Sequence, residues 1–329
     1  MQVIHVTETE EGQRLDRFLK KYLRTAPLGF IYKAIRRNVK VNGARVGVES
    51  ILKAGDEISL YLGDSQIAEF LVKEGAQTHK RQFKIVFEDD NLLVVTKPFG
   101  LLTHGDKQEK KNTLANQVVG YLIDSGSYLP GEEKTFTPAS VNRLDRNTTG
   151  LVLFGKNPKA LRDLNAMLRH HEDMEKTYLT IVKGQLTGAL HLKGKIVKDE
   201  LRNLVTILPE TAEEGRTVET KAIPVQQLNG YTLTEVTLIT GRPHQIRAHM
   251  AHAGFPIVGD AKYGDKRTNR YFEQRFGLTT QLLHAYKVRV NEGRESLTYL
   301  KGVVFESEYP ENIRTISSTL SREESRARK

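Results

Sequence analysis

The chain has 329 residues, a formal net charge of +10 at pH 7 and no cysteine. This length allows two domains with ordinary cores. The missing cysteines exclude disulfides, thiolate nucleophiles and cysteine-ligated zinc, while the basic excess favours a polyanionic partner. No run approaches the roughly 20 apolar residues of a membrane span, and the acidic N-terminus lacks the apolar core of a signal peptide. We therefore expect a soluble cytoplasmic protein that binds no membrane.

The N-terminal segment predicts a small domain of two helices and short strands. An amphipathic helix is indicated by apolar residues at helical spacing: Leu15, Phe18, Leu19, Tyr22 and Leu23. A second helix is expected after Pro27, with Ile31, Ala34 and Ile35 on its apolar side. Asn42-Gly43 is the strongest two-residue hairpin signal, so residues 41–46 predict a hairpin. Gly55-Asp56 then introduces a last strand, Glu57 to Leu62.

The charges of this segment have one sign. Between positions 17 and 45 there is no Asp or Glu but there are nine basic residues: Arg17, Lys20, Lys21, Arg24, Lys33, Arg36, Arg37, Lys40 and Arg45. A solvated helix face is one interpretation, but such faces normally mix both signs. We favour a surface that follows nucleic-acid phosphates. The segment also resembles the S-four-type (alpha-L) RNA-binding domain in residues 12–19, the basic second helix, residues 41–43 and residues 54–58.

Composition divides the chain into four parts. We expect the RNA-binding domain at 1–62, a polar linker at 63–84, a catalytic domain at 85–315 and a mobile charged tail at 316–329. In the third part, strands are expected at 85–87, 92–95, 178–182 and 233–239, and a helix begins at Pro158. Residues 192–222 alternate short apolar runs with turns, and their pattern predicts no definite element.

The central string Val141-Asn-Arg-Leu-Asp-Arg-Asn-Thr-Thr-Gly150 runs directly into the apolar residues 151–154. An aspartate between two arginines in a turn is often a structural salt bridge. The same arrangement can hold a reactive carboxylate on a loop that a buried strand anchors. With no cysteine, the nucleophile that remains is a carboxylate, because an aspartate is ionised at neutral pH without help from a base. The residues of this string alone leave both interpretations open.

A second informative stretch is Thr240-Gly-Arg-Pro-His-Gln-Ile-Arg-Ala-His-Met250. Pro243 suits the first position of a helix and Gly254 suits its end, which places Arg247 about one turn in. His244, His249 and His252 do not have the spacing of a metal site, so we expect no metal. The chain also lacks the glycine-rich signatures of P-loop and dinucleotide enzymes.

Together these blocks resemble the RluA-type pseudouridine synthase family, and within it the RluC- and RluD-like members that have an N-terminal alpha-L domain. The resemblance covers nearly the whole chain. It is carried by residues 90–100, Arg143-Leu144-Asp145 with residues 148–150, residues 176–184, the stretch 240–249, and residues 254–264 with 283–285. In one departure, Asn142 stands where the family usually has a histidine, which concerns local hydrogen bonding and leaves the nucleophile untouched.

The resemblance implies a role for each site residue. Asp145 would be the nucleophile, Arg247 its ionic partner, and Tyr178 a platform under the target base that could also accept a sugar proton. A tyrosine in a core strand is the alternative for Tyr178. Arg143 and Thr148 would act on the RNA as the uridine leaves the helical stack, while Val182 and Ile246 would line the pocket. The product is an isomer of the substrate, so no cofactor is expected.

The implied fold is α+β, with a mixed, mainly antiparallel bent sheet flanked by helices. The expected partner is large-subunit ribosomal RNA, with transfer RNA second, and the expected state is a monomer.

Two other classes of function are alternatives: a non-catalytic RNA-binding or ribosome-assembly factor, and a hydrolase that uses Asp145 on another substrate. The first would be expected to lack Asp145 or Arg247, and the second leaves the basic N-terminal segment unexplained.

Overall fold

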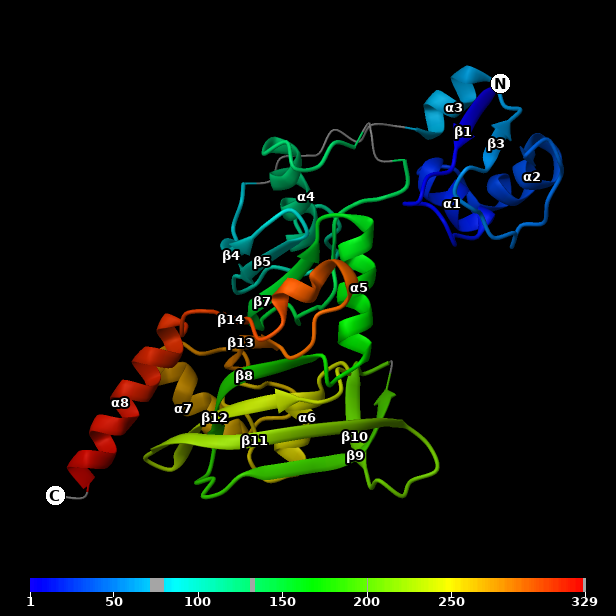
Figure 1. Cartoon of the computed structure of the whole chain (residues 1–329). Helices are drawn as coiled ribbons and strands as arrows, with labels where there is room; N and C mark the ends of the chain where they lie inside the picture. The colour runs from blue at the N-terminus through cyan, green and yellow to red at the C-terminus, as the bar shows by residue number, and fades with distance from the viewer. Residues whose placement is uncertain (72–79, 131–133, 200, 328–329) are drawn as a thin grey trace.

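The basic N-terminal segment folds into a three-stranded sheet packed against two helices. The computed structural model describes residues 1–71, 80–130, 134–199 and 201–327 (Figure 1). Its first elements are β1 (Gln2–His5), α1 (Leu15–Tyr22), α2 (Leu28–Asn38), β2 (Val39–Val41) and β3 (Glu57–Leu60), with the strands in the order β1-β3-β2. The apolar stripe that predicted α1 is buried in this small core, as is the apolar side of α2.

The predicted turn at Asn42-Gly43 is present. Both residues have positive φ angles, 50° and 77°, as a type I′ turn requires, and Val41 bridges Ala44 across it. The returning arm does not continue as a strand, however. The longer partner of β2 is β3, which pairs with β1 on its other side.

The expected linker at 63–84 is too long at both ends. Residues Asp64–Phe70 form helix α3, whose Ile67 is buried in the N-terminal core, and the Phe70 ring lies 4.7 Å from that of Phe30. At the other end, Phe83 is buried in the core of the second domain. The sparse apolar residues of this segment still have helical spacing, and the polar residues around them concealed it. Residues 72–79 lie outside the described part of the chain.

The second domain is built on one large sheet, which has 11 strands in the described residues. Along its main path the order is β10-β9-β11-β12-β8-β13-β7-β5-β4, while β14 pairs with β13 and β6 with β7. All neighbours are antiparallel except β7 and β13, so the expected mixed, mainly antiparallel sheet is confirmed. The strands are β4 (Lys84–Glu88), β5 (Leu92–Lys97), β6 (Ala139–Ser140), β7 (Thr149–Gly155), β8 (Met174–Lys183), β9 (Leu190–Asp199), β10 (Leu204–Leu208), β11 (Arg216–Leu228), β12 (Tyr231–Leu238), β13 (Leu283–Val290) and β14 (Val304–Glu306).

Helices cover this sheet and give it separate hydrophobic cores. They are α4 (Leu114–Asp124), α5 (Pro158–Arg169), α6 (Gln245–His252), α7 (Lys266–Phe276), α8 (Glu311–Ala327) and a 3-10 helix, Glu295–Leu300. Residues of α4 and α6 pack into one core, residues of α5 into a second, and residues of α7 and α8 into a third. The helix predicted from Pro158 is therefore correct, and Asn157 caps it by accepting a hydrogen bond from the amide of Ala160.

The expected mobile tail is instead most of helix α8 (Figure 1). Ile313, Ile316 and Leu320 are buried in the core that α8 shares with α7. Their spacing of three and four residues is that of an amphipathic helix, but the many charged and serine residues between them resemble a disordered terminus. The second domain therefore extends well beyond residue 315, and residues 328–329 lie outside the described part of the chain.

The two domains touch near Thr135. The Lys134 Nζ donates a hydrogen bond to the carbonyl of His5 at 2.8 Å, and the Gln13 side-chain amide lies 3.4 Å from the Thr135 hydroxyl. In Figure 1 the N-terminal domain stands at one end of the molecule, near the segment that precedes β6.

Candidate active site

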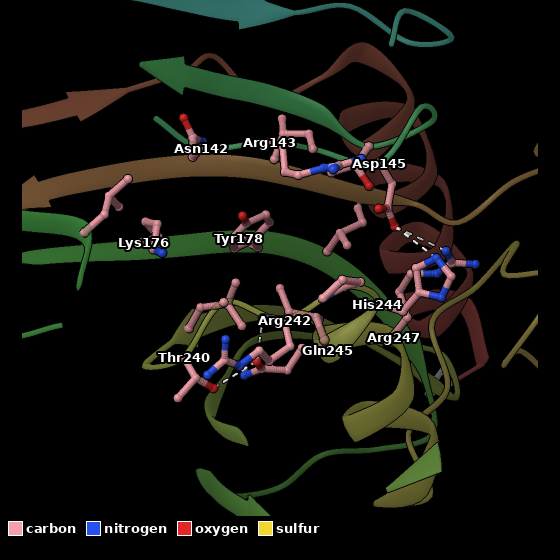
Figure 2. A pocket seen from close by; sticks show the side chains of 18 of the residues that line it. Asn142, Arg143, Asp145, Lys176, Tyr178, Thr240, Arg242, His244, Gln245 and Arg247 are labelled. Atoms are coloured by element: carbon pink, nitrogen blue, oxygen red, sulfur yellow. Dashed lines mark hydrogen bonds and ion pairs between the residues drawn. The ribbon is translucent and has the colours of Figure 1, made fainter. Parts of the chain in front are cut away.

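Three segments that are distant in sequence meet around one cavity of about 680 Å³. They are the loop 141–148 that leads into β7, the first half of β8, and the turn that leads from β12 into α6. Strands β7, β13 and β8 are neighbours in the sheet, which brings the loop and the Tyr178 strand together. Figure 2 shows Asp145, Tyr178 and Arg247 converging on this space from the three segments.

The loop that carries Asp145 is fixed from both sides. Asn142 donates to the carbonyl of Leu151 at 3.0 Å and accepts from the amide of Leu153 at 2.9 Å, so its amide joins the start of the loop to β7. On the other side, the buried Lys97 ammonium donates to the carbonyls of Leu101 and Arg146. Burial lowers the pKa of Lys97 to about 7, although the charge of Asp145 acts in the opposite direction.

Asp145 itself is 36% exposed and faces the cavity, and Arg247 is its cationic neighbour. The Arg247 Nη1 donates to the Asp145 Oδ2 at 3.3 Å. The other two nitrogens of the same guanidinium, Nε and Nη2, bind the two oxygens of Asp260 at 2.7 and 2.8 Å. Arg247 therefore joins a solvent-facing carboxylate to a buried one.

The inner pair, Arg247 and Asp260, fixes the direction of this guanidinium. The side chain of Asp260 is 0% exposed, and it also accepts hydrogen bonds from the backbone amides of Lys262 and Tyr263. Burial would raise the pKa of Asp260, but the hydrogen bond and charge of Arg247, together with the two backbone amides, lower it. Burial would likewise lower the pKa of Arg247, yet the bonds to Asp260 raise it. Both groups therefore stay charged, as catalysis by a fixed electrostatic partner requires.

His244 is a further cavity residue whose placement was not foreseen. It precedes α6 with a positive φ of 56°, so Pro243 lies before the helix and not at its first position as expected. Gly254, with a φ of 86°, does follow the helix as predicted. The His244 Nδ1 lies 2.9 Å from the Tyr263 hydroxyl, and its Nε2 lies 3.9 Å from the Asp145 Oδ2. Burial lowers the pKa of His244, an effect that the charge of Asp145 opposes.

Tyr178 lies on β8 with its ring against the core and its surface in the cavity wall. Burial raises the pKa of its hydroxyl, and the nearby charge of Asp145 raises it further, so the phenol remains protonated. Ile246 also lines the cavity, as expected. Val182 does not: it is fully buried and bridges Ile257. It lies four residues beyond Tyr178, roughly 13 Å along the strand, and so falls outside the space that the resemblance suggested.

The two residues expected to act on the RNA have different positions. Arg143 is exposed at the cavity wall, and in the view of Figure 2 it lies above Tyr178. Thr148 also borders the cavity, but its side chain is buried, and its amide closes the turn by donating to the carbonyl of Asp145 at 3.0 Å. Its local role is therefore to shape the loop.

The rest of the cavity is basic. Of the described residues that line it, Asp145 is the one carboxylate, while the Lys and Arg residues are Arg143, Arg169, Lys176, Lys198, Arg242 and Arg247. Such a lining suits an anionic ligand. No group of three or more His, Cys, Asp or Glu side chains in residues 1–71, 80–130, 134–199 and 201–327 is placed to hold a metal ion. None of the helices in those ranges is long and apolar enough to cross a bilayer.

Sequence reasoning identified the residues that meet in the cavity better than those that hold them. Asp260, Lys97 and Asn142 were noted only as parts of motifs. An aspartate between Gly259 and Ala261 gives no sign that it will be buried against a distant arginine. The hydrogen bonds of Asn142 explain how it can stand where the family usually has histidine.

Comparison with solved structures shows what class of fold this is. The human RNA pseudouridylate synthase domain containing 4 superposes with a TM-score of 0.56 at 21% identity, covering 72% of this chain and 92% of that one. The human RNA pseudouridylate synthase domain containing 1 superposes with a TM-score of 0.53 at 20% identity, covering 70% of this chain and 84% of that one. The fold is that of the pseudouridine synthases.

Comparison of sequences shows the family. The RNA pseudouridylate synthase family matches residues 91–252. The ribosomal large subunit pseudouridine synthase C of Vibrio vulnificus is 32% identical over 296 residues, which is 88% of each chain. The protein of the same name from Haemophilus influenzae is 31% identical over 306 residues, covering 91% of this chain and 89% of that one. The chain therefore belongs to the RluA-type family of RNA pseudouridine synthases, which are isomerases.

Proposed function

We propose that this protein converts specific uridines of large-subunit ribosomal RNA into pseudouridine, with transfer RNA as the second candidate substrate. The relatives named above act, by their names, on the ribosomal large subunit. The basic cavity and the nine cations of residues 17–45, a segment without Asp or Glu, fit a polyanion of this kind. The enzyme works as a cytoplasmic monomer and needs neither metal nor cofactor, because the product is an isomer of the substrate.

The observation that carries this proposal is the contact between Asp145 and Arg247 at the cavity wall. Asp145 opens the bond between ribose and uracil, whether by attack on the sugar, by attack on the ring or through a glycal. Arg247, held by Asp260, keeps the carboxylate charged and aimed. Tyr178 lies under the flipped base as its platform, and on the glycal route its oxygen is the acceptor for the sugar proton.

The other site residues assist this step. Arg143 fills the space that the uridine leaves when it swings out of the stack, since a base within a duplex must be extruded before it can react. Ile246 lines the pocket, and Thr148 holds the loop that presents Asp145 to the RNA. Exclusion of water matters, because the detached uracil must turn and rejoin through its fifth carbon without escaping.

The N-terminal domain supplies RNA affinity as an alpha-L module. Eight of its nine basic residues between positions 17 and 45 are exposed, and Lys40 is half-buried over the ring of Tyr61. None of the nine forms an ion pair with a carboxylate among the described residues. Unpaired, exposed cations are available to replace the counterions of RNA.

Substitution of Asp145 by Asn tests the chemistry. Tritium at the fifth carbon of uracil is released when the new carbon–carbon bond forms, so release from labelled large-subunit ribosomal RNA measures turnover. Asp145→Asn should abolish release and change RNA binding little, while Asp124→Asn, an exposed aspartate on α4, should retain normal release. Continued turnover by Asp145→Asn would show that the nucleophile has been assigned wrongly.

A further inference from the structure

Lys176 is a cation at the cavity wall to which the proposed chemistry has so far given no task. It lies on β8 two residues before Tyr178, so both side chains project from the same face, roughly 7 Å apart along the strand. Both line the cavity. In Figure 2, Lys176 and Asp145 lie on opposite sides of Tyr178. A base that covers Tyr178 with its ribose end at Asp145 therefore points its far edge toward Lys176.

The ammonium of Lys176 is available for a ligand. No carboxylate is recorded within ion-pair distance of it in the described residues. Gly241 is a near neighbour of the ammonium, since a Cβ atom added there would lie in ordinary contact with the Nζ, at 3.6 Å. The charges of Lys176, Arg242 and Glu219 all act on the pKa of His171, so these groups lie near one another. Burial lowers the pKa of Lys176, which marks a partly desolvated cation, and such a cation interacts strongly with any anion that arrives.

Uracil becomes such an anion when it is detached. Cleavage of the N1–C1′ bond leaves the electron pair on the ring, where it is shared between N1 and the two carbonyl oxygens. The ribose carbon is left for Asp145, or for the glycal if that is the route. The reaction thus needs a stabilising charge at the base as well as at the sugar, and Arg247 is already occupied by two carboxylates.

We propose that Lys176 is a catalytic residue that stabilises the detached uracil by donating a hydrogen bond to the carbonyl oxygen farthest from the ribose. This role rests on the proposed function, since it needs uracil to leave as an anion. It assigns the two ends of the cavity to the two products of bond cleavage: Asp145 to the sugar and Lys176 to the base. No proton has to be transferred, because the ammonium only donates a hydrogen bond.

The symmetry of uracil strengthens this assignment. A half-turn about the axis through N3 and C6 exchanges N1 with C5, which is the exchange that makes pseudouridine. The same half-turn exchanges the two carbonyl groups. Before the turn the atom opposite the ribose is the C4 carbonyl, and after it the C2 carbonyl takes the same place. A cation fixed at that position keeps a carbonyl partner at the start and the end of the rotation, which helps to retain the free base.

The test compares two leaving groups. Fluorine at the fifth carbon withdraws electrons, so 5-fluorouracil carries the negative charge more easily than uracil and needs less help from Lys176. Large-subunit ribosomal RNA transcribed with uridine or with 5-fluorouridine is treated with the full-length enzyme under single-turnover conditions. Uridine loses the hydrogen of its fifth carbon to give pseudouridine, whereas the fluorinated ring has no such hydrogen, keeps its fluorine and takes up water at the sixth carbon. Mass spectrometry of the nucleosides then gives the rate at which each of the two rearranged products forms.

The variants are Lys176→Met, Lys176→Arg and, as the matched control, Lys183→Met. Lys183 lies on the same strand, outside the cavity, and pairs with Asp265. Lys176→Met should slow the reaction of uridine by about 100-fold, the usual loss for one donor to a developing anion, and that of 5-fluorouridine by less than about 10-fold. Lys176→Arg should recover part of the loss, and Lys183→Met should behave as the wild type.

Equal losses for both substrates would overturn the proposal, because a purely structural defect does not distinguish leaving groups. An unchanged rate in Lys176→Met would overturn it as well. A raised KM with unchanged kcat and a flatter salt dependence would show that Lys176 binds a backbone phosphate instead. If the wild-type enzyme turned over neither RNA, the proposed function would fail first and this role with it.

Discussion

At the scale of single residues, the arginine between two carboxylates is the central feature of the site. Arg247 uses two nitrogens for the fully buried Asp260 and one for Asp145. A buried pair that loses one partner leaves an uncompensated charge, which is costly. The position of Arg247, and through it that of Asp145, therefore depends on a carboxylate that does not reach the cavity lining.

We predict that Asp260→Asn lowers both stability and turnover. The free energy of unfolding should fall by about 3 kcal/mol, the typical cost of breaking a buried ion pair from one side. Single-turnover tritium release should slow by at least about 100-fold, because the guanidinium is no longer aimed. Urea denaturation and the release assay measure the two effects. Glu292→Gln, which breaks the exposed pair with Lys301, should change neither by more than a small amount; a mild effect of Asp260→Asn would contradict the role of the inner pair.

Two buried histidines give the protein a pH-dependent stability. Burial lowers the pKa of His249, with a contribution from His252, and that of His284, in both cases to about 4. The Nε2 of each has no hydrogen-bond partner in the described structure. The unfolded chain binds protons at these residues below about pH 6.5, whereas the folded chain does not until about pH 4. Stability is therefore fully present above pH 6.5 and falls as the pH drops through that window.

The expected loss is about 2 kcal/mol per histidine between pH 6.5 and 5, since each pH unit is worth about 1.4 kcal/mol per proton. Urea midpoints measured across this range give the slope. His284→Asn keeps a polar atom near the Thr149 hydroxyl, which His284 contacts at 2.7 Å, and should remove about half of the slope. A double variant, His249→Asn with His284→Asn, that kept the wild-type slope would show that other groups are responsible.

At the scale of elements, the active-site loop depends on one close crossing of strands. Gly150 is the second residue of β7, just after the loop; it has a φ of 109° and pairs in parallel with Ala285 of β13. A Cβ atom at this position would lie 2.6 Å from the amide nitrogen of Ala285 and would also overlap its carbonyl group. Glycine is required here both for its backbone conformation and for the space.

Gly150→Ala should therefore destabilise the protein by more than about 3 kcal/mol, since it combines backbone strain with a clash against main-chain atoms. Gly126→Ala is the matched control. Gly126 also has a positive φ, 73°, but nothing lies within 4 Å of the added atom, so its cost should be about 1 kcal/mol. Thermal unfolding of the two variants separates the effects, and equal melting temperatures would rule out the close crossing as the cause.

The pattern of apolar residues predicts some of these helices and strands and not others. Helices α1, α2 and α5 and strands β5, β8 and β12 were predictable, because their apolar residues follow a clear period. Residues 192–222 were not. They form the long strands β9 and β11 with β10, and the outer face of β11 exposes apolar side chains such as Ile223 and Val225, which blurs the alternation. Helices α3 and α8 were missed because a few buried residues stand among many polar ones.

At the scale of the whole molecule, the basic N-terminal domain and the cavity belong to separate cores that meet at a few contacts near Thr135. Charge and motifs predict that the first domain binds RNA and the second holds the reactive site, but they did not predict the boundary between the two domains. That boundary depends on whether Ile67 and Phe83 are buried, and burial is a property of packing. The pairing of Asp145 with Arg247 was predictable through the family resemblance, while Asp260 required the fold.

We predict that the N-terminal domain sets the salt dependence of RNA binding. Replacing Lys33, Arg36 and Arg37 of α2 by Gln should reduce the slope of log affinity against log salt by about 2 to 3, one unit for each lost phosphate contact. The rate of pseudouridine formation within the enzyme–RNA complex, once the RNA is bound, should stay the same. The control replaces three exposed cations of α7, Lys266, Arg267 and Arg270, at the opposite end of the molecule in Figure 1. If both triple variants changed the slope equally, affinity would not reside in the N-terminal domain.

The uneven attachment of Arg247 has a mechanical consequence. Two short hydrogen bonds hold its guanidinium to the buried Asp260, whereas a single, longer hydrogen bond joins it to Asp145 at the cavity. When the aspartate shifts toward a sugar carbon, it can pivot about that one bond while the guanidinium stays still. We therefore expect any movement of Asp145 during the reaction to be confined to the loop between Asn142 and Thr148, because the two bonds to Asp260 hold the opposite wall in place.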